Sequence, residues 1–387
     1  MPDMSRRRIL TQGVAGLTSV AALTGMPSSA HADPRPAALS TDLSQVGVAP
    51  VDSFAGDNDD EKFAAALAYA KAQTYKPTIV FSNRAYSFTR TFPMDFRGLR
   101  ISGPLGGLAR EFGTTNQVSC PTGGLFSVVA GTTVDAAISG LSFFGKGRFI
   151  ADTPLDASGP ILTDTTISDC GFSGFATIFT GTVLRASIQR IYANNLTGSG
   201  FVLGGSDCWL FTDGPNYMSG NLPATTPYVD LVNLSQSDVG RLYVTPQGGY
   251  ALRIRDSFGG LNVRRFMSDG TGRTGALATQ NQGLLITGGH GVKIEDFWCF
   301  NVNASGSAQG EIVVTGGEGL VFDSPVFPRS HGPFTAVNTS SPCIYTTVPI
   351  VVSNPQAPTG HPKLLRQSTA GLITLTGAPG WTITTAP

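Results

Sequence analysis

Charged side chains are scarce in this chain of 387 residues. They make up 13% of the sequence, about half of the usual share. Coiled coils and disordered chains need far more charge, so both classes are excluded. The 26 basic and 26 acidic residues cancel. A neutral chain gives no reason to expect binding to nucleic acid or to an anionic membrane, so we expect neither as a partner.

Cysteine is also rare, and its spacing excludes common metal sites. No two of the five cysteines form a C-x-x-C pair, so zinc is not expected. Five cysteines are too few for a disulfide scaffold, although one or two disulfides could form outside the cell. Carboxylate clusters dense enough for calcium and glycine-rich phosphate loops are missing too, so the sequence predicts no metal and no cofactor. We interpret the cysteines as small buried hydrophobic residues: Cys120, Cys170, Cys208, Cys299 and Cys343.

The chain has one long apolar run, from about Gly13 to Met26. It is too short and too rich in small residues to span a membrane comfortably. A twin-arginine pattern, Ser5–Leu10, precedes it, and the small-x-small sequence Ala30–Ala32 follows. We therefore predict a twin-arginine signal peptide over residues 1–32, a Pro- and Ala-rich linker over 33–50, and a secreted, soluble protein.

Helical periodicity occurs at one place. Asp59–Glu61 put acid where the helix dipole favours it, and Phe63, Leu67 and Ala70 then fall on one face. This segment predicts a short capping helix within an N-terminal cap and first coil over residues 51–100. The rest of the chain consists of short β-branched or aromatic runs separated by Gly, Asn, Ser and Asp, a pattern typical of short strands.

The short runs repeat along the chain. Residues 283–301 read as strand, turn, strand, tight turn, strand and loop, and a second unit starts at Gly310. Such a unit cannot bury its own apolar face, whereas stacked units bury a continuous core. We predict a single-stranded parallel β-helix of about 8–10 coils over residues 101–345; a β-sandwich would show hairpin turns between its strands. The repeat is lost after about residue 345, so residues 346–387 are expected to form a C-terminal β cap.

The segment Asp52–Leu67, with Pro77–Phe81 and Arg84–Phe88, resembles the N-terminal cap of the pectate-lyase superfamily. Members combine an acidic Gly-Asp stretch, a short helix, a strand and a Gly-x-Tyr-like turn; here Arg84-Ala-Tyr86 stands where Pro-Gly-Thr-Tyr is usual. The resemblance implies a right-handed parallel β-helix. It implies no single chemistry, because the superfamily holds lyases, hydrolases, epimerases, transferases and phage tailspikes.

In this fold the tight turn usually carries a structural ladder. We expect Arg190 to pair with Asp169 and Asp213, while the adjacent like charges of Arg241 and Arg265 should splay into water or find other partners. The full set of tight-turn positions recurs every 21 to 31 residues: Asp169, Arg190, Asp213, Arg241, Arg265, Asp296 and Asp323.

The strand sheet before the first turn of each coil usually forms the substrate groove in this superfamily. Because side chains alternate along a strand, we expect Tyr228, Asp230, Arg253, Arg255 and Glu311 to point outward. Asp230 should lie near Arg253, and Glu311 roughly 10 Å from Arg253 at two coils' distance. The alternative is a solvated sheet face with one Asp–Arg ion pair, which contributes little energy.

Three chemistries fit this cluster. Guanidinium groups bind carboxylates, so a lyase on an acidic glycan is our first choice, with Asp230, Arg253, Arg255 and Glu311 as catalytic candidates. A glycoside hydrolase or glycosyl-transferring enzyme would use Asp230 and Glu311 as its carboxylate pair. A non-catalytic glycan-binding or tailspike-like protein would need only the residues that bind the glycan. The partner in each case is a polysaccharide or oligosaccharide, and the protein would be a monomer or a homotrimer.

Further substrate-binding candidates are Tyr228, whose ring could stack on a sugar, and residues of turns and loops beside the groove. Gly289-His290-Gly291 looks like the Gly-His-Gly motif of polygalacturonases, but the Asn-Thr-Asp and Asp-Asp motifs of that family are missing from the coils. His290 is therefore either a structural turn residue or a site residue. Tyr217 and Arg273 lie in long polar loops, where binding residues tend to occur.

Overall fold

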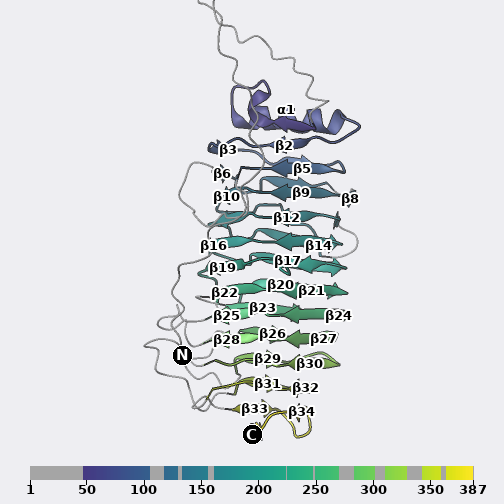
Figure 1. The fold of residues 1–387 in the computed structure, drawn as a ribbon, viewed down its shortest axis with the longest axis vertical. Helices are drawn as coiled ribbons and strands as arrows, with labels where there is room; N and C mark the ends of the chain where they lie inside the picture. Colours follow the sequence, from purple (N-terminus) through teal and green to yellow (C-terminus); the bar gives the residue numbers. More distant parts are fainter. Residues whose placement is uncertain are drawn as a thin grey trace, which may run out of the picture. The chain divides into compact units, whose positions relative to one another are not determined.

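Parallel strands stacked in three long sheets make up most of the described chain (Figure 1). The computed structural model describes residues 47–104, 117–129, 133–155, 161–223, 225–246, 249–269, 283–300, 310–328, 342–358 and 363–386. The predicted signal peptide and most of the predicted linker lie outside these residues, so both remain predictions. No helix in the described ranges is long and apolar enough to cross a membrane.

Sheet A has thirteen strands: β1 (Val48–Pro50), β2 (Thr78–Val80), β5 (Leu99–Ser102), β9 (Ala136–Ser139), β12 (Thr166–Ser168), β15 (Ser187–Gln189), β18 (Trp209–Leu210), β21 (Ser237–Gly240), β24 (Ser257–Arg264), β27 (Gly289–Glu295), β30 (Leu320–Asp323), β32 (Ile350–Ser353) and β34 (Ile373–Thr376). Sheet B has nine: β3 (Tyr86–Ser87), β6 (Gln117–Ser119), β10 (Ser142–Phe144), β13 (Gly171–Ser173), β16 (Tyr192–Leu196), β19 (Asn216–Gly220), β22 (Leu242–Pro246), β25 (Met267–Asp269) and β28 (Trp298–Phe300).

Sheet C is the short pair β4 (Phe92–Met94) and β7 (Phe126–Val128). Sheet D has eleven strands: β8 (Thr133–Val134), β11 (Ile161–Thr163), β14 (Phe179–Leu184), β17 (Phe201–Ser206), β20 (Pro227–Ser235), β23 (Tyr250–Arg255), β26 (Leu284–Ile286), β29 (Ile312–Val314), β31 (Ile344–Thr346), β33 (Leu364–Gln367) and β35 (Thr382–Thr385). The helical elements are the 3-10 turn η2 (Val51–Ser53) and the helix α1 (Asp59–Ala72).

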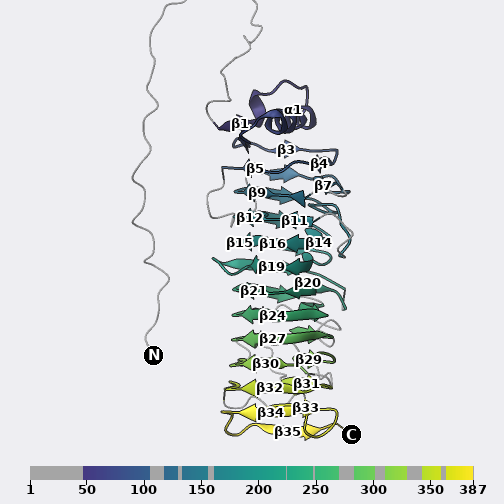
Figure 2. The same ribbon diagram turned by 90° about the vertical axis from the view of Figure 1, so that its right-hand side faces the viewer.

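Each coil runs from sheet D to sheet A and then to sheet B, as β23, β24 and β25 do (Figure 1). Figure 2 shows β21, β24 and β27 of sheet A stacked in one column. Single residues with left-handed backbone make both corners. Asp256 (φ 53°) connects β23 to β24, and Arg265 (φ 53°) connects β24 to β25. One such residue turns the chain from one sheet to the next within two or three positions, and the repeated corners let the coils stack in register. The predicted parallel β-helix with a capping helix is confirmed.

The core inside the coils is apolar and partly aromatic. Phe143 and Phe172 occupy the same position in adjacent coils and stack with ring centroids 5.4 Å apart. Phe266 and Phe297 repeat the arrangement at 5.3 Å. All five cysteines are free and buried, as predicted. Burial raises the pKa of the Cys208 thiol to about 11, so it stays a neutral, unreactive packing group at neutral pH.

The N-terminal cap is held by local hydrogen bonds and ion pairs. Asn58 caps α1 by accepting a hydrogen bond from the Glu61 amide at 2.9 Å. Arg84 then joins the start of the cap to the helix, because its Nη2 lies 2.5 Å from Asp52 and 2.7 Å from Asp59. The buried face of α1 includes the predicted Phe63. The segment that resembles the superfamily cap therefore covers the end of the stack at β1 and β2.

The parallel pairing continues past residue 345, where we expected the repeat to be lost. Strand β32 pairs with β30 and β34, and β33 pairs with β31 and β35. Ile350 and Val352 keep the inward alternation that the pairing needs. Parallel pairing in sheets A and D therefore extends beyond residue 345, while a separate C-terminal cap over residues 346–387 stays a prediction.

Candidate functional site

A buried carboxylate holds two arginines side by side on sheet D. Asp230 in β20 lies opposite Arg253 in β23, as predicted, and Val232 lies opposite Arg255. The Asp230 carboxylate accepts four hydrogen bonds. Arg253 donates from Nε at 3.0 Å and from Nη2 at 2.6 Å, and Arg255 donates from Nε at 3.1 Å and from Nη2 at 2.6 Å. Both guanidinium groups are therefore fixed in place by one anion.

Burial makes this arrangement stronger than a surface ion pair. The Asp230 side chain is 2% exposed, whereas those of Arg253 and Arg255 are 24% and 35% exposed. The hydrogen bond to Asp230 raises the pKa of Arg253 against the opposing effect of burial. Neither arginine donates a hydrogen bond from Nη1 to a residue that the structure describes. With both arginines and Asp230 ionised, the trio carries a net charge of +1.

Tyr250, at the start of β23, is a group near this cluster that we did not single out in the sequence. Burial raises the pKa of its hydroxyl, although the positive charge of Arg253 acts in the opposite direction. The phenol is therefore protonated at neutral pH and can donate a proton or a hydrogen bond.

Tyr228 is not on the exposed face, which corrects our prediction. It is fully buried, and its hydroxyl donates a hydrogen bond to the Gly220 carbonyl at 2.6 Å. The first six residues of β20 are all buried, so both faces of this strand are covered. Alternation separates two faces, but it cannot tell which of them reaches solvent. The ring is not available to stack on a sugar.

Glu311 lies farther from the arginines than predicted. In register, Arg253 stands beside Leu285 and then Val313, so Glu311 falls two residues short of this column. With about 4.8 Å per coil and 3.3 Å per residue, its backbone lies roughly 12 Å from Arg253 and roughly 16 Å from Asp230. Its side chain is buried at 8% exposure. The predicted cluster thus reduces to Asp230 and the two arginines.

The remaining substrate-binding candidates lie elsewhere. Tyr217 lies in strand β19 of sheet B and not in a loop, which corrects our prediction. Its ring stacks on Tyr192 at 4.8 Å and makes a tilted contact with Tyr243 at 5.7 Å. His290 is the second residue of β27 on sheet A. Its side chain is 60% exposed and stacks on the Phe258 ring. Arg273 lies outside the described residues.

The tight turns between sheets A and B carry the expected ladder. Arg190 forms ion pairs with Asp169 at 2.7 Å and with Asp213 at 2.5 Å, which confirms the predicted pairing. The hydrogen bond to Arg190 lowers the pKa of Asp169. Two turn positions shift, because the left-handed residues are Phe211 and Ser324 in place of Asp213 and Asp323.

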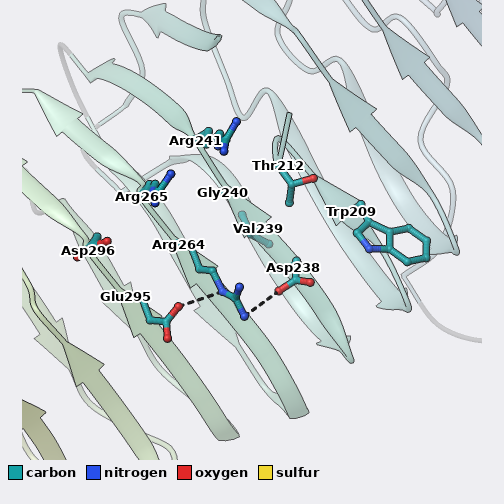
Figure 3. A pocket seen from close by; sticks show the side chains of 10 residues that line it. All are labelled: Trp209, Thr212, Asp238, Val239, Gly240, Arg241, Arg264, Arg265, Glu295 and Asp296. Atoms are coloured by element: carbon teal, nitrogen blue, oxygen red, sulfur yellow. Dashed lines mark ion pairs between the residues drawn. The ribbon is translucent and has the colours of Figure 1, made fainter. Parts of the chain in front are cut away.

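Beside this ladder, a cleft of about 400 Å³ opens on the outer face of sheet A (Figure 3). Trp209 lies at one end and is half exposed. Arg264 crosses the cleft between Asp238 at 3.7 Å and Glu295 at 3.0 Å. The lining residues are Trp209, Thr212, Asp238, Val239, Gly240, Arg241, Arg264, Arg265, Glu295 and Asp296. We missed this site in the sequence because we assigned Arg241 and Arg265 to the ladder. The exposed Trp209 is the sequence feature that could have indicated it.

Within the described ranges, no three His, Cys, Asp or Glu side chains gather closely enough to hold a metal ion.

No protein-family model matches the chain, and no curated protein matches it. Solved structures do. The Agl-KA catalytic domain aligns over 92% of this chain and 70% of its own, with 12% identity and a TM-score of 0.51. The A-module of the mannuronan C-5 epimerase AlgE4 from Azotobacter vinelandii aligns over 87% of this chain and 100% of its own, with 11% identity and a TM-score of 0.49. DFA-IIIase from Arthrobacter chlorophenolicus A6, in complex with DFA-III, aligns over 81% and 84%, with 14% identity and a TM-score of 0.46.

Sequence identities this low show similarity of fold and nothing about function. Together with the three parallel sheets, the likeness to the Agl-KA domain assigns the chain to the right-handed parallel β-helix proteins. A right-handed parallel β-helix is the fold that the cap segment implied.

Proposed function

We propose that the protein is a secreted enzyme that cleaves an acidic polysaccharide by β-elimination, with Arg253 and Arg255 binding the uronate carboxylate. One observation carries this proposal: a buried Asp230 fixes two guanidinium groups side by side and leaves the Nη1 donors of both without a described partner.

The chemistry of a lyase accounts for this arrangement. In β-elimination a base takes the proton from the carbon beside the uronate carboxylate, the glycosidic C–O bond breaks as a C=C bond forms, and the leaving oxygen takes up a proton. Negative charge develops on the carboxylate in the transition state. Two guanidinium groups that are already positioned stabilise this charge without reorganising. They therefore lower the free energy of the transition state more than mobile charges would. Asp230 is a positioning residue here, because both of its oxygens already accept hydrogen bonds from the arginines.

The glycoside hydrolase alternative is weakened because Asp230 and Glu311 lie too far apart to act as its carboxylate pair. Glycosidases place two carboxyl groups about 5–9.5 Å apart, whereas the backbones of Asp230 and Glu311 lie roughly 16 Å apart by strand spacing. A glycan-binding protein without activity would still use the arginine pair, so the test must read binding as well as turnover. Export through the twin-arginine route and a monomeric or trimeric state belong to the same proposal.

The test uses the mature chain with polygalacturonate, alginate and a neutral glucan as substrates. Reducing ends and the ultraviolet absorbance of unsaturated uronate are measured together. A rise of both signals on an acidic substrate is the expected result. Reducing ends alone would mean hydrolysis, and binding with neither signal would mean a glycan-binding protein; both results contradict a lyase.

Arg253→Ala and Arg255→Ala test the assigned site. Each removes charged hydrogen bonds worth about 1.5–3 kcal/mol, so kcat/KM should fall roughly 10- to 100-fold. Arg185→Ala is the matched control, because Arg185 also sits in a coil of the stack and pairs with an aspartate, Asp164, at 2.7 Å. Unchanged kcat and KM in Arg253→Ala would reject the site even if the enzyme proved to be a lyase.

A further inference from the structure

Two arginines at the tight turns lack the partners that their neighbour has. Arg241 and Arg265 occupy the same turn position in consecutive coils, with φ of 46° and 53°. Their backbones are therefore about 4.8 Å apart. Arg190, two coils before Arg241, is neutralised by two aspartates. Arg241 and Arg265 form no ion pair with any residue in the described ranges. Two adjacent like charges repel each other unless an anion lies between them.

The cleft supplies the rest of a ligand site. Figure 3 shows the guanidinium groups of Arg241 and Arg265 along one side of the cleft and Trp209 at its end. The indole of Trp209 is 50% exposed, although large apolar groups normally gain by burial. The cleft spans the four coils of β18, β21, β24 and β27, about 14 Å along the stack. That length admits more than one sugar ring.

The central arginine of the cleft is already neutralised. Arg264 lies 3.0 Å from Glu295 and 3.7 Å from Asp238, and Lys293 also pairs with Glu295. Arg264 therefore shapes the floor of the cleft, while Arg241 and Arg265 keep their charges for a ligand. The outer carboxylate, Asp296, lines the far end and can accept hydrogen bonds from sugar hydroxyls.

We propose that this cleft is a second binding site, separate from the arginine pair on sheet D, and that it takes an acidic oligosaccharide. Arg241 and Arg265 bind a carboxylate or sulfate group of the ligand, and Trp209 stacks on a neighbouring sugar ring. That the ligand is a saccharide rests on the proposed function. That the cleft binds an anion rests on the two arginines and not on any catalytic role of sheet D.

Binding is measured on the mature chain by titration calorimetry and by quenching of tryptophan fluorescence. The probes are trigalacturonate, a sulfated chondroitin tetrasaccharide and neutral maltotriose. The test variants are the double variant Arg241→Gln/Arg265→Gln and Trp209→Phe. Arg185→Gln is the matched control, because Arg185 has the same left-handed backbone (φ 51°) and lies outside the cleft. Arg253→Ala removes the sheet D site without touching the cleft.

We expect at least one acidic probe to bind with saturable quenching and the neutral probe to bind much more weakly. The double variant should lose about tenfold or more in affinity, Trp209→Phe should lose most of the quenching, and Arg185→Gln should match the wild type. In Arg253→Ala the quenching should persist even if all turnover is lost, which separates this proposal from the proposed function. Equal affinity in the double variant and the wild type would overturn it, as would no saturable binding of either acidic probe.

Discussion

The Asp230→Asn variant tests whether one buried carboxylate holds the arginine pair. The change removes the negative charge and keeps the size of the side chain, so two guanidinium groups on one strand lose their counter-ion. Removing one partner of a buried pair typically destabilises by about 3–5 kcal/mol. Repulsion between two charges roughly 5 Å apart contributes about 3 kcal/mol at an effective dielectric constant of 20. Arg253 and Arg255 are partly exposed, and their solvation reduces the expected loss to about 2–4 kcal/mol.

Equilibrium unfolding in urea, followed by tryptophan fluorescence, measures this loss. A second variant, Asp230→Asn with Arg255→Gln, removes one of the two repelling charges and should recover about 1–2 kcal/mol. Raising the salt concentration should also reduce the loss in the single variant, because the arginines are partly exposed. The m-values must agree between variants for the comparison to hold.

A loss below about 0.5 kcal/mol in Asp230→Asn would refute the reasoning, because a change of that size is usual for a surface site. So would a double variant that is less stable than the single one. Either result would mean that water or other groups already solvate the arginines, and the argument for a fixed carboxylate-binding pair would fail with it.

Two further predictions concern stability away from this site. Burial tends to raise the pKa of Asp52, but hydrogen bonds from Arg84 and its neighbours lower it to about 2. The Asp52–Arg84 pair therefore stabilises the fold fully above the unfolded pKa of 3.8 and loses this contribution as the pH falls towards 2. Urea unfolding between pH 5 and pH 2 should show a loss of about 1 kcal/mol in the wild type, after solvent screening, that the Asp52→Asn variant lacks. An equal dependence of stability on pH in both proteins would contradict this. Gly205 has φ 119°, and an added Cβ would lie 1.8 Å from the Val183 carbonyl oxygen. Gly205→Ala should therefore destabilise the protein by about 2–4 kcal/mol in the same assay. Wild-type stability in this variant would mean that the two coils can move apart without an energetic cost.

The parts of the fold that depend on local pattern could be predicted from the sequence. The cap helix follows from its acidic start and apolar spacing, and the coil repeat follows from short runs between turn residues. The pairing of Arg190 with Asp169 and Asp213 followed too, because partners one coil apart are brought together by any regular stack. The same logic placed Asp230 beside Arg253.

The predictions that were wrong or incomplete have three causes, of which the first two are the register between coils and the covering of a strand face by other residues. The coils differ in length, so counting coils alone put Glu311 in the wrong column by two residues. Alternation assigned Tyr228 to the outer side of β20, yet that side is covered and the ring is buried. The cleft on sheet A was missed for a third reason. The sequence separated Arg190 from the like charges of Arg241 and Arg265, but only the structure shows that these two arginines line one cleft with Trp209.

The two arginine pairs of this chain differ in how far they are organised before a ligand arrives. Arg253 and Arg255 share a buried anion that fixes their orientation, and a fixed pair suits the strict geometry of a transition state. Arg241 and Arg265 have no such clamp among the described residues, so a ligand must order both side chains when it binds and loses affinity by doing so. A site of this second kind tolerates different sugars and linkages. The contrast supports our two proposals, which place chemistry at sheet D and binding of the polymer at sheet A.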